Sequence, residues 1–189
     1  MPNYISTADA ARALVRANRV LVIGCSGGGK TTLSRRIADH FDLAYRSLDR
    51  EVFWLPGWQS RDRQEQRSLI GRLVENERWV MDGSNPSSFD LRLPRADLVF
   101  WVRVARRVAL MGVIRRAARH YGSVRSDMAN GCPERLPDRA FLSYIWNFER
   151  THAPIFERNI DQYGPKVPVA VLRSHREMEQ LFPDPVPKQ

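Results

Sequence analysis

The sequence predicts an α/β fold, with a parallel sheet that is covered by helices on both faces. Short apolar runs alternate with segments of helical periodicity along the chain, which is the pattern of parallel strands joined by helices. One apolar run, residues 19–23, leads into a glycine-rich stretch, and Leu33, Ile37 and Phe41 then follow at helical spacing. Ligands of such sheets bind where the strands end, so side chains directly after strands are the first candidates for a site.

Each predicted element has boundaries in the sequence. Five apolar runs are predicted strands: residues 19–23, 43–48, 79–81, 97–102 and 167–172. Helices are expected directly after the glycine-rich stretch and at residues 6–17, 61–76, 106–120, 138–159 and 176–181. Residues 121–137 carry Gly, Pro, Asn and charge and are expected to be a mobile loop, while the proline-containing tail, 183–189, is expected to be frayed. With 189 residues, the chain is expected to form a single domain.

Composition limits the class of protein. Apolar residues make up 43% and charged residues 27% of the chain, as in an ordinary globular domain. No run approaches the ~20 apolar residues of a membrane span, the N-terminus lacks a secretory pattern, and Cys25 and Cys132 form no disulfide framework. We therefore expect a cytoplasmic protein. The net charge of +9 fits phosphate-rich substrates, nucleic acid, or an arginine-biased genome with a solvated surface, and composition leaves these open.

Residues 24–31, Gly-Cys-Ser-Gly-Gly-Gly-Lys-Thr, match the pattern G-x-x-x-x-G-K-[ST] of a phosphate-binding loop. The glycines of this loop let successive N–H groups point inward and form a nest for an anion; they are Gly24, Gly27, Gly28 and Gly29. Lys30 would place an ammonium against the terminal phosphates, and the Thr31 hydroxyl would ligate Mg²⁺. The lysine is informative because only three of the 30 basic residues are lysine. The alternative is an ordinary glycine-rich turn.

Two carboxylates directly follow predicted strands. Asp82 ends an apolar strand before Gly83, where a carboxylate can hold Mg²⁺ directly or through water, or can simply end the strand in a turn. Asp49 follows the second strand, where it can orient or deprotonate an acceptor hydroxyl, or serve as a cap. We favour the metal role for Asp82 and the acceptor role for Asp49.

Nine arginines lie between Arg103 and Arg139, against three acidic residues. Phosphoryl transfer needs charge to be neutralised on the transferred group, and an arginine-bearing loop can close over a site to supply it. The best candidates are Arg115, Arg116, Arg119 and Arg125, and the others are expected to be solvated or structural. Three further candidates are Arg92 for the same site, and Trp54 and Trp58 either for stacking on the acceptor or for anchoring an irregular loop.

The sequence lacks the residue patterns of three other kinds of site. The four histidines and two cysteines show no zinc-ligand spacing, and no Ser-His-Asp elbow is visible. An Asn-Lys-x-Asp motif for reading guanine is also absent, which makes adenine the default base.

Together these residues resemble the P-loop kinases of the adenylate kinase type, and most closely the adenylate kinase-related family called DNA topology modulation proteins. The resemblance spans residues 19–175 and rests on residues 24–32, 48–49, 54, 56–58, 79–83, 125–127, 131–135 and 144–148. It implies a three-layer P-loop NTPase fold with five parallel strands, ATP with Mg²⁺, and an arginine-bearing lid at about residues 121–137. It carries the donor-site role to Gly24, Gly27, Gly29, Lys30, Thr31 and Thr32, and the lid role to Arg115, Arg119 and Arg125.

The chain departs from true adenylate kinases at two places, and both argue against AMP as the acceptor. Residues 84–86 are Ser-Asn-Pro rather than Phe-Pro-Arg, and Asp49-Arg50 stands where a nucleoside monophosphate site has another pattern. Asp49 is closer to what kinases of small-molecule hydroxyls place there.

The predicted function is therefore a phosphotransferase that moves the γ-phosphate of Mg-ATP to a small-molecule or nucleotide acceptor. The expected catalytic residues are Lys30, Asp49, Arg115, Arg119 and Arg125, and the expected metal ligands are Thr31 and Asp82. The alternative is a nucleic-acid-associated ATPase or an ATP-dependent regulator of DNA topology, although no recognisable nucleic-acid-binding module is present. No membrane partner is expected, and the oligomeric state is left open.

Overall fold

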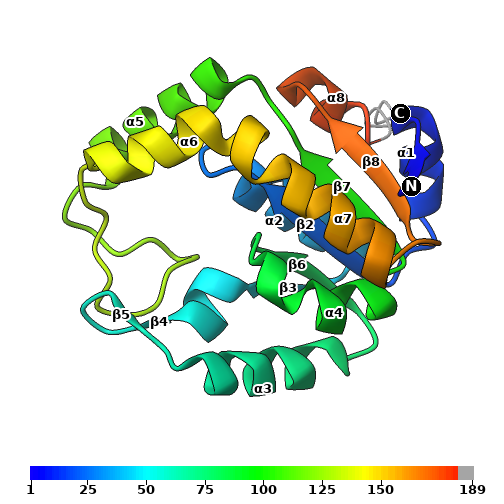
Figure 1. Cartoon of the computed structure of the whole chain (residues 1–189), viewed down its shortest axis with the longest axis horizontal. Coiled ribbons are helices and arrows are strands. Elements are labelled where there is room, and N and C mark those ends of the chain that lie inside the picture. Colours follow the sequence, from blue (N-terminus) through cyan, green and yellow to red (C-terminus); the bar gives the residue numbers. More distant parts are fainter. Residues whose placement is uncertain (183–189) are drawn as a thin grey trace, which may run out of the picture.

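A central parallel sheet organises the computed structural model, which describes residues 1–182 (Figure 1). Its six strands follow the order β1-β8-β7-β2-β6-β3, and every neighbouring pair is parallel. They are β1 (Asn3–Ile5), β2 (Arg19–Gly24), β3 (Ala44–Ser47), β6 (Trp79–Asp82), β7 (Leu98–Val102) and β8 (Pro168–Leu172). The predicted α/β class with a parallel sheet is confirmed, and the tail that was expected to be frayed lies outside the described residues.

Helices cover both faces of the sheet, because successive strand residues point to opposite sides. In β2, Leu21 and Ile23 belong to one buried cluster, while Val20 and Val22 belong to the other. The first cluster is covered by α3 (Arg63–Val74), α4 (Phe89–Arg92), α5 (Arg106–His120), α6 (Arg139–Thr151) and α7 (Ala153–Tyr163). The second is covered by α1 (Thr7–Leu14), α2 (Lys30–Phe41) and α8 (His175–Glu179).

The sheet has six strands rather than the expected five. The additional strand is β1, which pairs with β8 from Asn3↔Pro168 to Ile5↔Ala170 at the edge of the sheet. Its three residues are exposed or partly exposed, so they carry no apolar run that marks a strand. β1 forms because it pairs with a strand that is distant in the sequence, and the local sequence pattern does not indicate such a pairing.

The helix expected at residues 138–159 is divided into α6 and α7. The break lies at His152, and Pro154 occupies the first turn of α7. Proline lacks the N–H that a continuous helix would need and clashes with the preceding turn. The expected start is confirmed, because Asp138 caps α6 by accepting from the backbone N–H of Phe141.

Residues 121–137, here called the lid segment, connect α5 to α6 without regular helix. Glu134 closes the segment on itself, since its N–H donates to the Ser123 carbonyl at 2.9 Å and its carbonyl accepts from the Gly122 N–H at 3.0 Å. The segment then packs on a small antiparallel pair, β4 (Trp54–Leu55) and β5 (Gln59–Ser60). Figure 1 shows it descending from α5 to this pair, on the side of the sheet where α2 begins.

The strand order places the predicted site residues at one edge. β2, β6 and β3 are consecutive neighbours, so the phosphate loop, Asp82 and Asp49 all lie at the carboxyl ends of adjacent strands. No helix within residues 1–182 is long and apolar enough to cross a membrane.

Candidate active site

The phosphate loop joins β2 to α2 by a sharp turn. Gly24 has a φ of +136°, and a Cβ there would lie 2.1 Å from the Val102 carbonyl oxygen, so only glycine fits. α2 begins at Lys30, which aims its N–H groups and positive dipole end at the loop. Lys30 Nζ donates to the Cys25 carbonyl at 3.0 Å, and this contact holds the ammonium over the loop.

Asp82 and Thr31 meet beside the loop. Thr31 Oγ1 donates to Asp82 Oδ2 at 2.5 Å, and the Tyr45 hydroxyl donates to the same oxygen at 3.5 Å. Asp82 is only 6% exposed, and this burial raises the pKa of its carboxyl, while the Lys30 charge works in the opposite direction. The neutral form of Asp82 is therefore favoured unless positive charge lies close to the carboxylate.

These two side chains fit a magnesium site. Both present oxygen atoms, the ligand type that Mg²⁺ prefers, and Mg²⁺ in nucleotide sites takes few protein ligands because phosphates and waters complete its shell. No group of three or more His, Cys, Asp or Glu that could hold a metal without a substrate occurs among residues 1–182.

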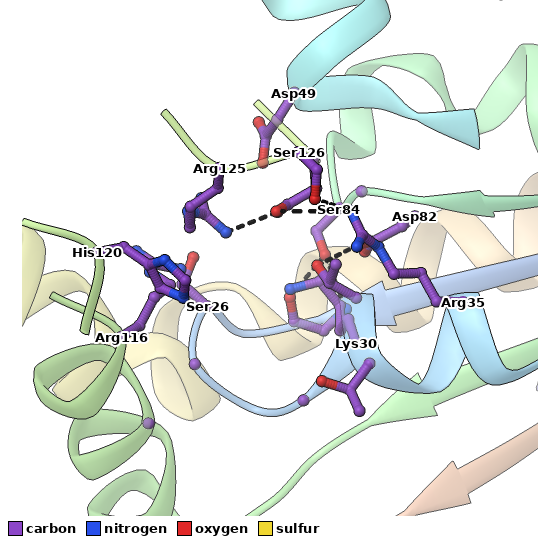
Figure 2. A pocket seen from close by; sticks show the side chains of 18 of the residues that line it. Ser26, Lys30, Arg35, Asp49, Asp82, Ser84, Arg116, His120, Arg125 and Ser126 are labelled. Carbon is purple, nitrogen blue, oxygen red and sulfur yellow. Dashed lines mark hydrogen bonds and ion pairs between the residues drawn. The ribbon is translucent and has the colours of Figure 1, made fainter. Parts of the chain in front are cut away.

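Asp49 begins a π-helical turn, residues Asp49–Phe53, directly after β3 and Leu48. Burial raises the pKa of its carboxyl, and the nearby charges of Lys30 and Arg125 lower it by less. Figure 2 shows Asp49 and Lys30 at opposite sides of the pocket, with Arg125 and Arg116 beside the space between them. A carboxyl in this position, with a raised pKa, is suited to accept a proton from a hydroxyl.

One cavity of about 1450 Å³ collects nearly all the predicted site residues. Those that line it are Gly24, Gly27, Gly29, Lys30, Thr31, Thr32, Asp49, Asp82, Arg115, Arg116, Arg119 and Arg125. Gly28 belongs to the loop but does not line the cavity. The volume exceeds the roughly 300–1,000 Å³ of a typical pocket for one small ligand.

The arginines of the cavity differ in how they are held. Arg125 donates through Nε to Glu134 and through Nη1 to Asp127, at 2.8 and 2.6 Å. Arg116 donates through Nε to the other oxygen of Glu134, also at 2.8 Å. No ion pair with another residue of the described chain engages Arg115 or Arg119, so these two side chains are available to an anionic ligand.

Arg92 does not face the site, contrary to expectation. It is fully buried beneath the loop after β6, where it donates to the carbonyls of Gly83 and Asn85 at 2.7 Å and to Ser88 Oγ at 3.0 Å. Burial lowers its pKa to about 9. Arg92 therefore shapes the backbone beside Asp82 rather than touching a ligand.

Trp54 and Trp58 anchor the lid segment. They pack against Met128, Ala129 and Cys132, and Trp58 Nε1 donates to the Pro133 carbonyl at 3.0 Å. Neither tryptophan lines the cavity. Of the two alternatives for these residues, the anchoring role is the one that their contacts support.

Sequence reasoning missed two residues that build the site. Ser84 Oγ donates to the Gly24 carbonyl at 2.6 Å and accepts from the Gly24 N–H at 2.8 Å, which joins the loop after β6 to the start of the phosphate loop. Gly112 in α5 lies against the phosphate loop, because a Cβ there would be 2.1 Å from the Gly27 carbonyl oxygen. A glycine in the middle of a helix was the available signal for this close approach.

Comparisons with known proteins address the fold. No family model matches the chain, and no curated protein matches it. Among solved structures, it is similar to shikimate kinase from Bacteroides thetaiotaomicron, with a TM-score of 0.52 and 15% identity over 87% of this chain and 94% of that chain. Shikimate kinase from Acinetobacter baumannii, in complex with shikimate, gives 0.52 and 12% identity over 90% of this chain and 92% of that one. The chain shares its fold with these two shikimate kinases.

A third solved structure is deoxyadenosine kinase from M. mycoides with bound dATP, which has a TM-score of 0.49 and 13% identity over 85% of this chain and 95% of that chain. The finer resemblance to the DNA topology modulation proteins is not confirmed by any of these comparisons.

Proposed function

We propose that this protein is a P-loop phosphotransferase that moves the γ-phosphate of Mg-ATP to a hydroxyl of a small-molecule or nucleotide acceptor. The observation that carries the proposal is the single cavity in which the phosphate loop, Asp82 and Asp49 meet. A nucleotide-binding protein without an acceptor has no need for a carboxylate facing Lys30 across that cavity.

Each group has one task in this proposal. The loop N–H groups and Lys30 bind the β- and γ-phosphates, and Arg115, Arg119 and Arg125 neutralise charge on the transferred group. Asp49 orients the acceptor hydroxyl and takes its proton. Thr31 and Asp82 hold Mg²⁺, which supplies positive charge to the phosphate oxygens when it is bound.

The proposal is tested with Lys30→Ala and an acceptor screen. Wild-type protein with Mg-ATP is offered nucleoside monophosphates, nucleosides, sugars and 5′-hydroxyl oligonucleotides, and transfer of the γ-phosphate is followed. We expect Lys30→Ala to lower transfer by roughly 100-fold or more, because it removes a charge that acts in the transition state. The matched control is Lys166→Ala, an exposed lysine outside the cavity, which should retain wild-type transfer.

Transfer at the wild-type rate in Lys30→Ala would contradict the proposal. The alternative function, a nucleic-acid-associated ATPase, gives a different result: hydrolysis stimulated by DNA, with DNA affinity that falls steeply as salt rises. Tight ATP binding with no acceptor used in the whole screen would point to a nucleotide-binding protein instead.

A further inference from the structure

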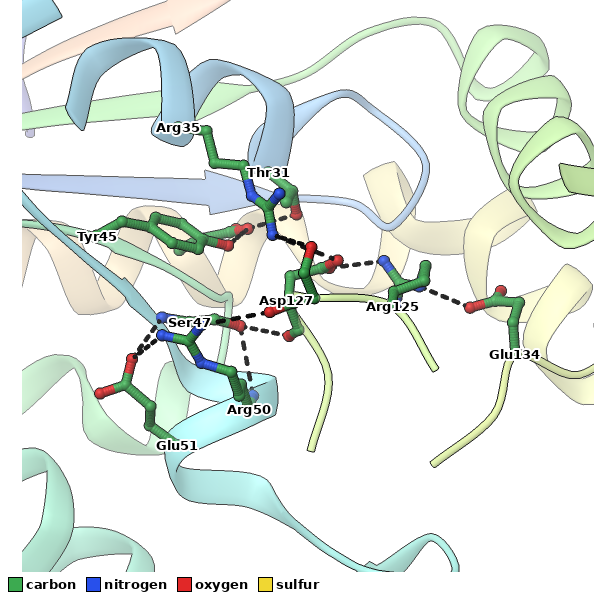
Figure 3. Close-up of polar contacts among 11 residues, drawn as sticks. Thr31, Arg35, Tyr45, Ser47, Arg50, Glu51, Arg125, Asp127 and Glu134 are labelled. Atoms are coloured by element: carbon green, nitrogen blue, oxygen red, sulfur yellow. Dashed lines mark hydrogen bonds and ion pairs between the residues drawn. The ribbon is translucent and has the colours of Figure 1, made fainter. Parts of the chain in front are cut away.

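Glu134 is a buried carboxylate near the end of the lid segment. It is 5% exposed, and each of its two oxygens accepts from a different arginine: Oε1 from Arg116 Nε and Oε2 from Arg125 Nε, both at 2.8 Å. Both arginines line the cavity beside the phosphate loop, whereas Glu134 does not. Figure 3 shows the Arg125 side of this contact, continuing to Asp127.

The atoms that make these contacts determine which N–H groups of the two arginines remain free to bind a ligand. A guanidinium has five N–H donors, one on Nε and two on each terminal nitrogen. Arg116 donates to Glu134 through Nε alone, and its two terminal nitrogens make no hydrogen bond with residues 1–182. Arg125 gives Nε and Nη1 to carboxylates, so Nη2 remains. The terminal nitrogens of arginine can donate to phosphate oxygens, often through two parallel hydrogen bonds.

We propose that Glu134 is a positioning residue that holds Arg116 and Arg125 by their Nε atoms and presents the terminal nitrogens of Arg116 and Nη2 of Arg125 to the phosphates of the bound nucleotide. The inference rests on the proposed phosphotransferase function. It explains why an acidic residue is buried in an arginine-rich lid: one carboxylate fixes two long side chains that would otherwise each lose rotamer freedom on binding.

The position of Glu134 is itself fixed by its backbone. Its N–H donates to the Ser123 carbonyl, and its carbonyl accepts from the Gly122 N–H. The lid segment is tied to the core by Ser47 Oγ, which donates to the Asp127 carbonyl at 2.7 Å (Figure 3). A second tie is Arg35, which donates to Ser126 Oγ at 2.7 Å. The carboxylate is thereby placed relative to the phosphate loop, and so are the two arginines.

The test uses the full chain with Glu134→Gln and two probes, hydrolysis of Mg-ATP and calorimetric titration with inorganic tripolyphosphate. We expect the variant to lose roughly 10- to 100-fold in kcat/KM for hydrolysis, because small misplacement of charge-stabilising groups has effects of that size, and to bind tripolyphosphate more weakly. The matched control is Glu149→Gln. Glu149 pairs with Arg103, and neither residue lines the cavity, so this variant should keep both properties.

A double-variant comparison separates positioning from a structural role. In an Arg116→Ala/Arg125→Ala background, adding Glu134→Gln should cause no further loss, because Glu134 acts through those arginines. A further loss as large as that seen in wild type, or wild-type behaviour of Glu134→Gln with both probes, would overturn the inference. Should Glu134→Gln fail to fold, Glu134→Asp keeps the charge but is too short for both arginines, and unchanged tripolyphosphate binding in it would overturn the inference equally.

The two proposals fail differently. Wild-type protein that neither binds nor hydrolyses ATP would remove the phosphotransferase function, while the tripolyphosphate titration would still decide whether Glu134 prepares an anion site. Wild-type protein that hydrolyses ATP, together with an unaffected Glu134→Gln, would leave the function standing and remove only the role of Glu134.

Discussion

Asp49 combines a position suited to a base with a pKa that burial raises above its ordinary value of about 3.9. If it takes the proton of the acceptor hydroxyl, it acts only when deprotonated, so transfer should fall as pH drops through this raised pKa. We expect Asp49→Asn to lower kcat by roughly 10²- to 10⁴-fold and to remove this acidic limb from the pH profile. Rates measured from pH 4 to 8 check both effects.

The control for Asp49 is Asp42→Asn. Asp42 is an exposed residue with φ +52° at the end of α2, and asparagine tolerates that conformation as well as aspartate does. An acidic limb that persists in Asp49→Asn, or disappears in Asp42→Asn, would assign the proton transfer to another group.

Asp82 and Asp90 should change stability in opposite directions with pH. Burial raises the folded-state pKa of Asp82, so its contribution is most favourable below the unfolded pKa and is lost as pH rises through the folded one. The Arg67 ion pair lowers the pKa of Asp90, so its contribution is present above the unfolded pKa and is lost in acid.

Without ATP, Asp82→Asn should therefore raise Tm at pH 7 and have little effect near pH 4. Asp90→Asn should lower Tm at both pH values, because the contribution of Asp90 is lost only as pH falls further, through its lowered folded-state pKa. Thermal unfolding at the two pH values measures both variants. Destabilisation of Asp82→Asn at pH 7 would mean that the hydrogen bond from Thr31 depends on the charge of Asp82.

At the scale of elements, α5 and the phosphate loop are packed backbone to backbone. A Cβ on Gly112 would lie 2.1 Å from the Gly27 carbonyl oxygen, and a Cβ on Gly27 would lie 2.1 Å from the Ala109 carbonyl oxygen. Gly112→Ala must therefore push α5 away from the loop. We expect a lower Tm and at least about tenfold weaker ATP binding, because the phosphate loop loses the conformation that binds phosphate.

Gly71→Ala in α3 is the matched control, since nothing lies within 4 Å of the added Cβ. Alanine is the better helix former by up to about 1 kcal/mol, which corresponds to a rise of roughly 2–4 °C in Tm for a domain of this size. Calorimetry and ATP titration distinguish the two helical glycines. Equal behaviour of both variants would show that α5 can shift without cost to the loop.

The features that depend on residues close together in the sequence could be predicted. The phosphate loop is one continuous motif, and Asp49 and Asp82 follow apolar runs, so their shared edge follows from the rules of parallel sheets. The role of Glu134 could not be predicted, because its partners are Arg116 in α5 and Arg125 nearer the start of the lid segment. The break between α6 and α7 had a local signal, Pro154, whereas β1 exists only through its pairing with β8.

At the scale of the whole molecule, the lid segment is held by a cluster separate from the two cores that cover the sheet. Met128 is 4% exposed and packs with Ala129 and Cys132 against Trp54 and Trp58. Burial of one such side chain contributes about 1.5–3 kcal/mol, so removing it should release the segment without unfolding the sheet. The affected function would be the one that needs Arg125 in place.

We therefore expect Met128→Ser to speed trypsin cleavage after Arg125 and to slow ATP hydrolysis, while Tm changes little. Leu136→Ser is the control from the same segment, because Leu136 is 67% exposed and its removal releases no packing. Limited proteolysis with identification of the fragments measures the first effect. If Met128→Ser is cleaved no faster than Leu136→Ser, the contacts of Ser47, Arg35 and Trp58 with the segment suffice to hold it. The arginines would then be positioned by hydrogen bonds rather than by this apolar cluster.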